Sequence, residues 1–182
     1  MKKLKGFEAI YGKILFLGTS VGGNSMKRGF YYMDRNNKFW ELIDKICDTN
    51  YFSIKKNEYL LSLNNEPLKD FIRQEIKQKL NEFNIGISDI IESCENTTNS
   101  SDSGIVKTSI VYNHELNSLV QNADIIVLNG TGRTVKEFYK AVEYLKIDIS
   151  NKNVLAVYSS SGAANGTGNK RDVMWISIRK FI

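Results

Sequence analysis

The stretch KILFLGTS, residues 13–20, decides the fold class of this chain. Its apolar run, Ile14–Leu17, is followed by a glycine and small polar residues, which is typical of a β-strand buried on both faces. The pattern returns in DIIVLNG at residues 124–130 and in NVLAVYSS at residues 153–160. Strands of this kind form parallel sheets with helices on both faces, so the sequence predicts an α/β protein.

Segments with helical periodicity lie between the predicted strands. The most regular is Pro67–Phe83, whose apolar residues fall on one stripe, with a proline at its start and Gly86 just past its end. Residues 36–46 also have apolar side chains at helical spacing, with Asn36 or Asp34 as candidate N-caps. Further helices are predicted at residues 115–121, 135–145 and 173–182, and a weaker strand at residues 105–112.

This alternation of strands and helices, together with the chain length, sets the expected architecture. We expect a three-layer α/β/α fold with a mainly parallel central sheet of about four strands, joined by right-handed crossovers. A length of 182 residues, 42% of them hydrophobic, fits a single domain over residues 1–182. Residues 96–104 contain no apolar side chain and are rich in turn formers, so we expect an exposed loop there rather than a linker between domains.

The composition limits which binding partners and which kinds of active site are expected. A net charge of +5 and a pI of about 9.1 favour a polyanionic partner such as nucleic acid without establishing one. Cys47 and Cys94 are the only cysteines, no CxxC occurs and there is one histidine, so we expect neither a disulfide framework nor a metal site. We also expect no cofactor. The lone histidine, His114, lies among polar residues and is interpreted as a solvated helix start; a Ser-His-Asp or Cys-His site would have to use it. The N-terminal apolar run is too short for a signal peptide or a membrane span, which indicates a cytoplasmic protein.

The predicted strands end in small polar residues that should meet at one edge of the sheet. Ligands bind such sheets outside the carboxyl ends of the strands, which here carry residues 18–20, 129–130 and 159–162. Glycine-rich turns after strands often hold phosphates, but GTSVGG at residues 18–23 is not GxGxxG. The turn at residues 130–132 lacks the third glycine, and GxxxxGK[ST] does not occur. A tight turn without a ligand is therefore the alternative interpretation of these loops.

A cluster of aromatic residues follows the first of these loops. The cluster and its polar neighbours are Phe30, Tyr31, Tyr32, Asp34, Asn36, Asn37 and Trp40. Flat rings beside amide and carboxylate groups suit a purine or pyrimidine base. Aromatic rings also dominate protein cores, so core packing is the alternative for each ring.

Five blocks of sequence, in order along nearly the whole chain, match a known pattern. ILFLGTSVGGNS at residues 14–25, with YY at 31–32 and NKFW at 37–40, resembles a strand-GSxPG loop leading to YYxxPxNxFW. GISDIIESCE at residues 86–95 resembles GIxxxDVxxxCxR, and SDSGI at residues 101–105 resembles the GSLDSxI that follows it. IVLNG at residues 126–130 is similar to IFFNG, and YSSSGAA at residues 158–164 is similar to LPSTSPA. The chain thus resembles the uracil-DNA glycosylase superfamily, and most closely its hypoxanthine-DNA glycosylase group.

The resemblance implies a DNA glycosylase of base-excision repair, which hydrolyses the N-glycosidic bond of hypoxanthine or uracil extruded from DNA. Asn37 is then the catalytic residue, with a carbonyl that orients water or favours a cationic sugar; an ordinary first-turn helix residue is the alternative. Asp89 would accept a hydrogen bond from a ring N–H, and a helix cap is its alternative. The implied base-binding residues are Gly18, Thr19, Ser20, Tyr31, Tyr32, Asp89 and Asn129, with the Thr19 and Ser20 backbone N–H groups as a cradle for the departing base. The implied DNA-contacting residues are Ser159, Ser160, Ser161, Gly162 and Asn165.

The blocks also depart from the pattern. Gly22 stands for the first-loop proline, Asp34-Arg35 for the HP before the asparagine, and Tyr158 and Gly162 for two prolines of the last block. The last block has no histidine, which disfavours uracil-specific catalysis. Because proline stiffens loops, these changes leave a second interpretation, a catalytically weak or inactive nucleotide- or nucleic-acid-binding α/β protein on the same scaffold. In the first interpretation the partner is DNA with a damaged base, and we expect a monomer without membrane contact.

Overall fold

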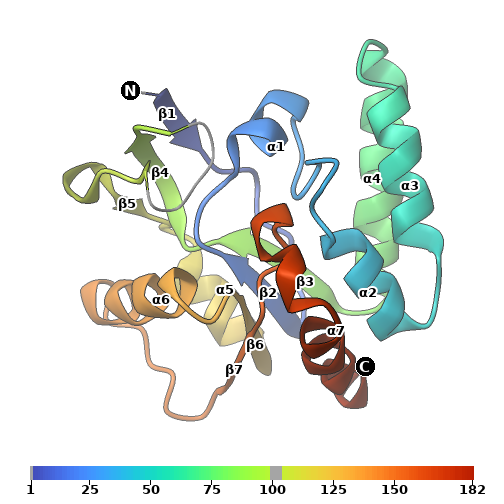
Figure 1. Ribbon diagram of the computed structural model, residues 1–182. Helices are drawn as coiled ribbons and strands as arrows, with labels where there is room; N and C mark the ends of the chain where they lie inside the picture. The colour runs from blue at the N-terminus through green and yellow to red at the C-terminus, as the bar shows by residue number, and fades with distance from the viewer. Residues whose placement is uncertain (1, 99–103) are drawn as a thin grey trace.

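The structure is a computed structural model that describes residues 2–98 and 104–182. At its centre lies a parallel sheet (Figure 1) built from β2 (Ile14–Gly18), β3 (Ile85–Asp89), β6 (Ile125–Asn129) and β7 (Asn153–Val157). The strand order is β3-β2-β6-β7, and every neighbouring pair runs parallel. The expected α/β fold with a mainly parallel sheet of about four strands is therefore confirmed.

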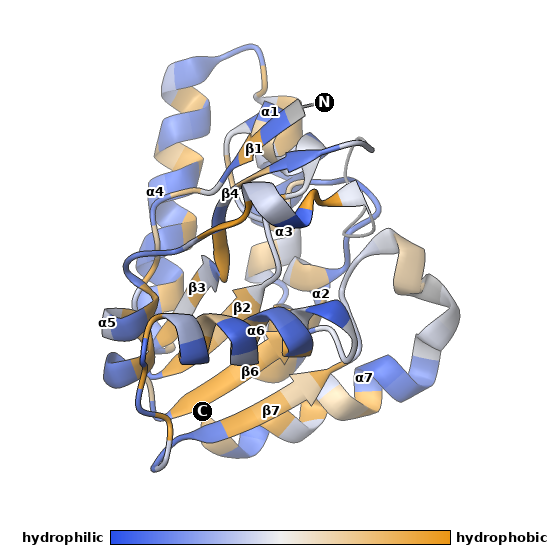
Figure 2. Ribbon diagram, turned by 90° about the vertical axis from the view of Figure 1, so that its left-hand side faces the viewer, coloured by the Kyte–Doolittle hydropathy of each residue, from blue (hydrophilic) through white to orange (hydrophobic). Residues whose placement is uncertain are grey.

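Helices cover both faces of this sheet. One face is covered by α2 (Phe39–Cys47), α4 (Glu66–Glu82) and α7 (Gly168–Ile176), and the other by α5 (Leu116–Asn122) and α6 (Arg133–Tyr144). Successive residues of β2 alternate between the two cores: Ile14 and Phe16 belong to the first, Leu15 and Leu17 to the second. Figure 2 shows the hydrophobic strands enclosed between the helices, which confirms the three layers.

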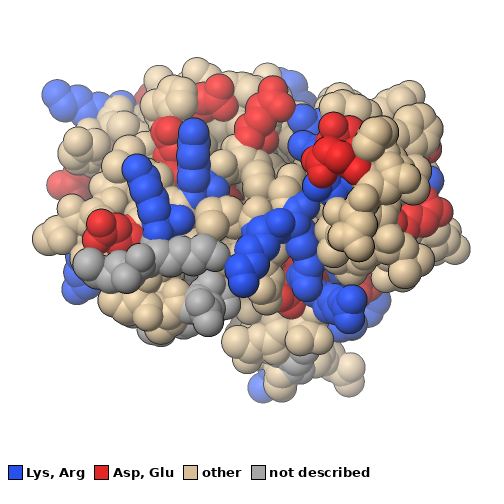
Figure 3. All heavy atoms as spheres, turned by 90° about the horizontal axis from the view of Figure 1, so that it is seen from above, with Lys and Arg blue, Asp and Glu red and all other residues tan. Residues whose placement is uncertain are grey.

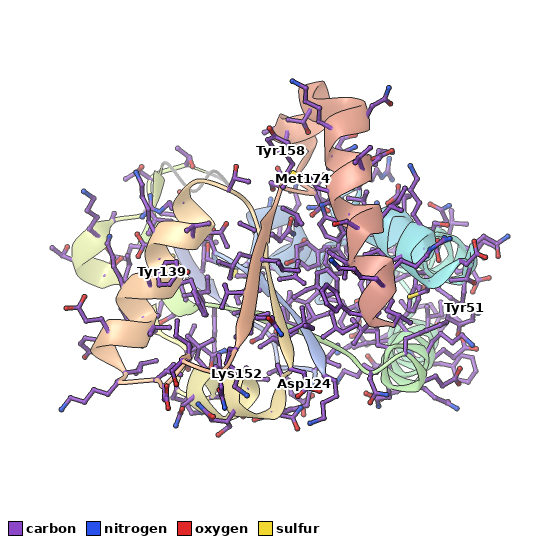
Figure 4. The ribbon with its side chains drawn as sticks, turned by 90° about the horizontal axis from the view of Figure 1, so that it is seen from below. Tyr51, Asp124, Tyr139, Lys152, Tyr158 and Met174 are labelled. Carbon is purple, nitrogen blue, oxygen red and sulfur yellow. The ribbon has the colours of Figure 1, made fainter. Side chains whose placement is uncertain are left out.

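The view from below (Figure 4) shows the same layers at the end of the sheet where the strands begin. Asp124 and Lys152 lie at the starts of β6 and β7. Tyr139, on α6, lies on one side of the sheet, and Tyr51, on α3 (Tyr51–Leu61), lies on the other. Helix α3 packs on α2 and α4 and so forms an outer part of the first layer.

A second, smaller sheet is antiparallel and corrects one prediction. It consists of β1 (Lys2–Lys5), β4 (Ile91–Asn96) and β5 (Val111–Tyr112), in the order β1-β4-β5. The strand expected at residues 105–112 is instead a 3-10 helix at Lys107–Ser109 followed by β5, so it does not join the parallel sheet. The fourth parallel strand is β3, which the prediction missed because glycine, serine and aspartate interrupt its apolar residues.

The helix predictions hold with shifted ends. The predicted Pro67–Phe83 helix is α4, with Asn65 as its N-cap: Asn65 Oδ1 accepts a hydrogen bond from the Leu68 N–H at 3.2 Å. Gly86 does not end this helix but lies within β3, where a Cβ would fall 2.8 Å from the Ile10 carbonyl oxygen. The helix expected at 173–182 is α7 followed by a 3-10 helix at Ser177–Phe181. The prediction missed α3 and α1 (Gly23–Arg28).

Three expectations concern loops, membranes and metals. Of the loop expected at residues 96–104, residues 99–103 lie outside the described part of the chain; Thr97 and Thr98 are exposed, whereas Asn96 and Gly104 are buried. Across residues 2–98 and 104–182, the structure has no helix that is both long and apolar enough to span a membrane. Within the same ranges, no group of three or more His, Cys, Asp or Glu residues is arranged to hold a metal ion.

Candidate active site

The loops at the carboxyl ends of β2, β6 and β7 meet around one cavity of about 670 Å³. The predicted site residues that line this cavity are Gly18, Thr19, Ser20, Tyr31, Tyr32, Asn37, Asp89, Asn129, Ser159, Ser160, Ser161 and Gly162. Asn165 lies in the 3-10 helix Gly162–Thr167, and its side chain is outside the described part of the chain. The residues assigned from blocks far apart in the sequence therefore come together in space.

The loop after β2 forms one wall and is tied to the loop after β6. Thr19 is buried, and its hydroxyl oxygen lies 2.9 Å from that of Thr134. The Thr134 hydroxyl also donates to the Asn129 carbonyl oxygen at 3.3 Å. Ser20 is half-buried beside Thr19. These contacts fix the main chain at Thr19 and Ser20, where the backbone cradle is expected.

Gly18 leaves the space into which two predicted base-binding side chains reach. A Cβ at Gly18 would lie 2.9 Å from the Tyr32 hydroxyl and still closer to the Asp89 carboxylate. Any larger residue would displace one of these groups. Glycine is therefore required here by close approach, rather than by a left-handed backbone.

Asn37 lies in the turn that precedes α2, on the opposite wall. Its Oδ1 accepts a hydrogen bond from the Phe39 N–H at 2.9 Å, and its own N–H donates to the Asp34 carbonyl at 3.1 Å. The next N–H, of Lys38, donates to the Ser160 carbonyl at 2.8 Å, which ties the turn to the last loop. The helix expected from residue 36 begins at Phe39, so Asn36 and Asp34 are not its caps, because both precede its first turn. Asn37 is half-buried and lines the cavity.

Asp34 lines the cavity as an ionised carboxylate. Burial raises the pKa of Asp34, but hydrogen bonds from Asn24 and from the Asn36 N–H, with the charges of Arg28 and Lys56, lower this pKa below its ordinary value overall. The Asn24 amide donates to Asp34 Oδ2 at 2.5 Å, and the Asn36 N–H donates to Oδ1 at 2.8 Å. The sequence indicated Asp34 only as a carboxylate beside the aromatic cluster, without a role of its own in the reaction.

Asp89 ends β3 at the point where the two sheets join. It is 5% exposed and lines the cavity. Its carbonyl accepts a hydrogen bond from the Asn113 amide at 3.0 Å, and the following Ile90 N–H donates to the Gly18 carbonyl at 2.9 Å. The interpretation of Asp89 as a helix cap is wrong, because the residue ends a strand and the next element, which begins at Ile91, is the strand β4.

The aromatic cluster divides between the core and the cavity. Phe30 is 2% exposed and stacks on Trp40 with 6.0 Å between ring centroids, so it belongs to the core. Tyr31 lines the cavity, but its hydroxyl donates to the Phe7 carbonyl at 3.0 Å. Burial, and then the nearby Asp89 carboxyl, raise the pKa of Tyr31, which keeps this hydroxyl a donor.

Tyr32 is the half-buried ring of the cluster. It stacks on Phe39, with 3.8 Å between centroids and an interplanar angle of 13°, and it lines the cavity. Its φ of 54° is a left-handed backbone conformation that is strained for a bulky residue. Such strain is typical of residues whose position the surrounding structure dictates.

Asn129 and Ser160 join the β6 and β7 loops. The Asn129 amide donates to Ser160 Oγ at 2.9 Å, and its Oδ1 accepts from the Ser160 N–H at 2.8 Å. Both residues are buried, at 7% and 0% exposure. A Cβ at Gly162, in the same last loop, would lie 2.9 Å from the Asn36 side chain, so this loop also packs closely on the turn before Asn37. The Asn129 side chain therefore braces the last loop as well as facing the cavity.

The lining is polar and carries acidic groups. Asp34 and Asp89 are its carboxyl groups, and among the described residues no lysine or arginine lines it. Other lining residues were not assigned from the sequence: Phe7, Val21, Asn24, Ser25, Ala163 and Ala164. Except for Phe7, these residues lie within the quoted blocks, which could have indicated them. Phe7 precedes all of the blocks, so only the structure reveals it.

Comparisons with known proteins give a likeness of fold. No protein-family model matches this chain, and no curated protein matches it. Among solved structures, it is similar to the solution NMR structure of a protein from Methanosarcina acetivorans described as a "putative Uracil DNA glycosylase". The two chains are 22% identical, with a TM-score of 0.68, over 99% of this chain and 98% of that chain. The shared fold therefore extends over nearly the whole of both chains.

Proposed function

We propose that this protein is a DNA glycosylase of base-excision repair, which hydrolyses the N-glycosidic bond of a deaminated base extruded from DNA. One observation carries the proposal: Asn37, the Gly18–Ser20 loop, Asp89 and the last loop all line a single cavity. Their sequence blocks resemble the uracil-DNA glycosylase superfamily, and the fold likeness to a solved structure described in those terms supports the same assignment. The proposal includes a single domain over residues 1–182.

The proposed reaction needs no nucleophilic side chain. The sugar develops oxocarbenium character as the bond to the base lengthens, and a water molecule adds to it. Oδ1 of Asn37 uses one lone pair on the Phe39 N–H, and its second lone pair is available to orient this water or to face the cationic sugar. The carboxylate of Asp34, whose pKa is lowered, adds negative charge to the same lining and so favours the cationic sugar over the neutral ground state.

The base is recognised, in this proposal, between Tyr32 and the end of β3. The Tyr32 ring, backed by Phe39, offers a flat apolar surface for stacking. An ionised Asp89 accepts a hydrogen bond from the N1–H of hypoxanthine or the N3–H of uracil, whereas adenine presents a bare ring nitrogen to it. The main-chain N–H groups of Thr19 and Ser20 receive the carbonyl oxygen of the departing base, which carries the developing negative charge.

The DNA backbone is held, in this proposal, by small groups more than by a basic groove. Ser159–Gly162 and Asn165 offer N–H and hydroxyl donors that fit between phosphates. Figure 3 shows the molecule from above. Lys and Arg side chains lie across the middle of the face seen in this view, with Asp and Glu side chains among them. An interrupted basic surface and a net charge of +5 suit contact with only a few phosphates.

The deciding experiment presents the protein with defined lesions. Duplex and single-stranded oligonucleotides carrying uracil, hypoxanthine or only normal bases are incubated with the protein and then treated with alkali, which breaks the strand at abasic sites. We expect strand breaks at a modified base alone, and the broken substrate identifies the lesion. DNA binding without any breaks would favour the second interpretation, a weak or inactive nucleic-acid-binding protein. The absence of both DNA binding and strand breaks would overturn the proposal.

A further inference from the structure

A buried lysine lies behind the turn that carries Asn37, outside the cavity. Lys56, on α3, is 2% exposed. Its ammonium donates to the Asn37 carbonyl at 2.5 Å and lies 3.5 Å from the Arg35 carbonyl. Glu41 Oε2, on α2, is 3.5 Å from the same nitrogen. A side chain from a helix that contributes nothing to the cavity lining thus reaches the main chain of the proposed catalytic residue.

Burial of this lysine is not explained by packing. Lysine is almost never fully buried unless it is paired, because its ammonium loses its hydration. Burial lowers the pKa of Lys56, and the Glu41 carboxylate offsets part of that effect. An apolar side chain of similar length would fill the space without this desolvation. What the ammonium adds is an ion pair with Glu41 and a donor directed at two main-chain carbonyls of one turn.

The same turn is held from its other side. The Lys38 N–H donates to the Ser160 carbonyl, so the main chain on both sides of the Asn37–Lys38 peptide group is anchored. The chain contains a single proline, Pro67, so none of the loops around the cavity is stiffened by that residue. Hydrogen bonds must therefore restrict the orientation of Asn37, and among the described residues Lys56 supplies the one to Asn37 that comes from a charged donor.

We infer that Lys56 is a positioning residue for the reaction: its ammonium holds the main chain of Asn37 so that the amide side chain faces the cavity in one orientation. The inference rests on the proposed function. A shift of about 1 Å in a reacting group can reduce a rate by about a hundredfold. Loss of the Lys56 hydrogen bond should therefore slow the chemical step. Lys56 does not line the cavity, so substrate binding should change little.

The test compares Lys56→Met with two controls. Lys55→Met removes the neighbouring lysine, which pairs with Glu58 on α3 and with Glu75 on α4. Ile76→Val, in the core of α4, lowers stability without touching the turn. For each variant, kcat and KM are measured on the lesion that the wild type cleaves, together with urea unfolding. We expect Lys56→Met to lower kcat at least about tenfold with KM within about twofold of wild type, and both controls to keep the wild-type kcat.

A second variant keeps the test decisive if methionine disturbs the fold. Lys56→Gln is neutral but retains an N–H donor, and we expect its kcat to lie between those of wild type and Lys56→Met. An unchanged kcat in Lys56→Met, or a decrease no larger than that of Ile76→Val, would overturn the inference while the proposed function stands. Failure of both Lys56 variants to fold would also overturn it, since the lysine would then serve the fold. No base release by the wild type would overturn the proposed function itself.

Discussion

Replacing Asn37 with alanine should separate a small structural effect from a large catalytic one. The side chain has a structural partner, because its Oδ1 accepts the Phe39 N–H at the start of α2. Loss of such a helix-start hydrogen bond costs about 1 kcal/mol of unfolding free energy. Asn37 lines the cavity. In the proposed mechanism, the same substitution also removes the group that orients the water or faces the cationic sugar.

The two magnitudes are far enough apart to be distinguished. We expect Asn37→Ala to reduce cleavage at least about a hundredfold, equivalent to about 2.7 kcal/mol of transition-state stabilisation, with little change in DNA affinity. A domain with about 5–15 kcal/mol of stability remains almost entirely folded after losing about 1 kcal/mol. Partial unfolding therefore cannot account for a hundredfold decrease in rate.

Asn37→Asp is the matched control. Its carboxylate can still accept the Phe39 N–H, so the unfolding free energy should stay within about 0.5 kcal/mol of wild type. It also keeps an oxygen toward the cavity, so cleavage should exceed that of Asn37→Ala. The assay is single-turnover strand cleavage on the preferred lesion, with urea unfolding and a DNA-binding titration in parallel. Equal single-turnover rates for wild type and Asn37→Ala would refute the assignment of Asn37 as the catalytic residue.

Four further outcomes follow from the site. Asn129→Ala removes both hydrogen bonds to Ser160 and should lower the unfolding free energy by about 2–4 kcal/mol. Ser160→Ala removes only one of them and should lower it by about 1 kcal/mol. Equal urea midpoints for these two variants would contradict the role of Asn129 in holding the last loop. Asp89→Asn can both donate and accept, so it should discriminate less well between lesion and adenine; unchanged selectivity in a merely less stable variant would make Asp89 a structural residue. The pKa of Asp34 is lowered on folding, so its carboxylate contributes stability above the ordinary pKa of 3.8 that is lost as pH falls through the lower folded pKa. The difference in unfolding free energy between wild type and Asp34→Asn should shrink on acidification below about pH 4. A difference that does not change with pH would contradict the stabilising role of the ionised Asp34 carboxylate. DNA affinity should decrease with salt at a slope matching only a few phosphates, and a slope near zero would indicate a small-molecule ligand.

The sequence was sufficient for the central strands and for the position of the main loops. KILFLGTS predicted β2 because strands buried on both faces need a continuous apolar run. It was insufficient for β3, where two residues interrupt the apolar run. Gly86 lies close to the main chain of residues 10–12, and buried Ser88 accepts a hydrogen bond from the Asn113 amide at 3.0 Å. It was also insufficient for α3, whose apolar residues form only a weak stripe because the helix packs at the edge of its layer.

Only the site residues that lie within the short sequence blocks could be predicted. Asn37 and Asp89 lie within such blocks, and the cavity includes both. Phe7 and Lys56 lie outside the blocks, and nothing local distinguishes them: Lys56 follows Lys55 in a segment that reads as a charged surface. Their positions depend on how α3 and the segment after β1 dock in three dimensions, which periodicity and propensity do not encode.

The order of the parallel strands has a consequence for how the chain is synthesised. β2 is near the N-terminus, but residue 14 pairs with residues 85 and 125, so neither neighbour exists when β2 leaves the ribosome. At about 5–20 residues per second, β2 waits roughly 5–20 s for β6. During that time its apolar run is exposed to chaperones and to other nascent chains, and local helices such as α4 form first. Synthesis of β6 and β7, rather than of the Asn37 turn, therefore limits how soon the cavity can assemble on a growing chain.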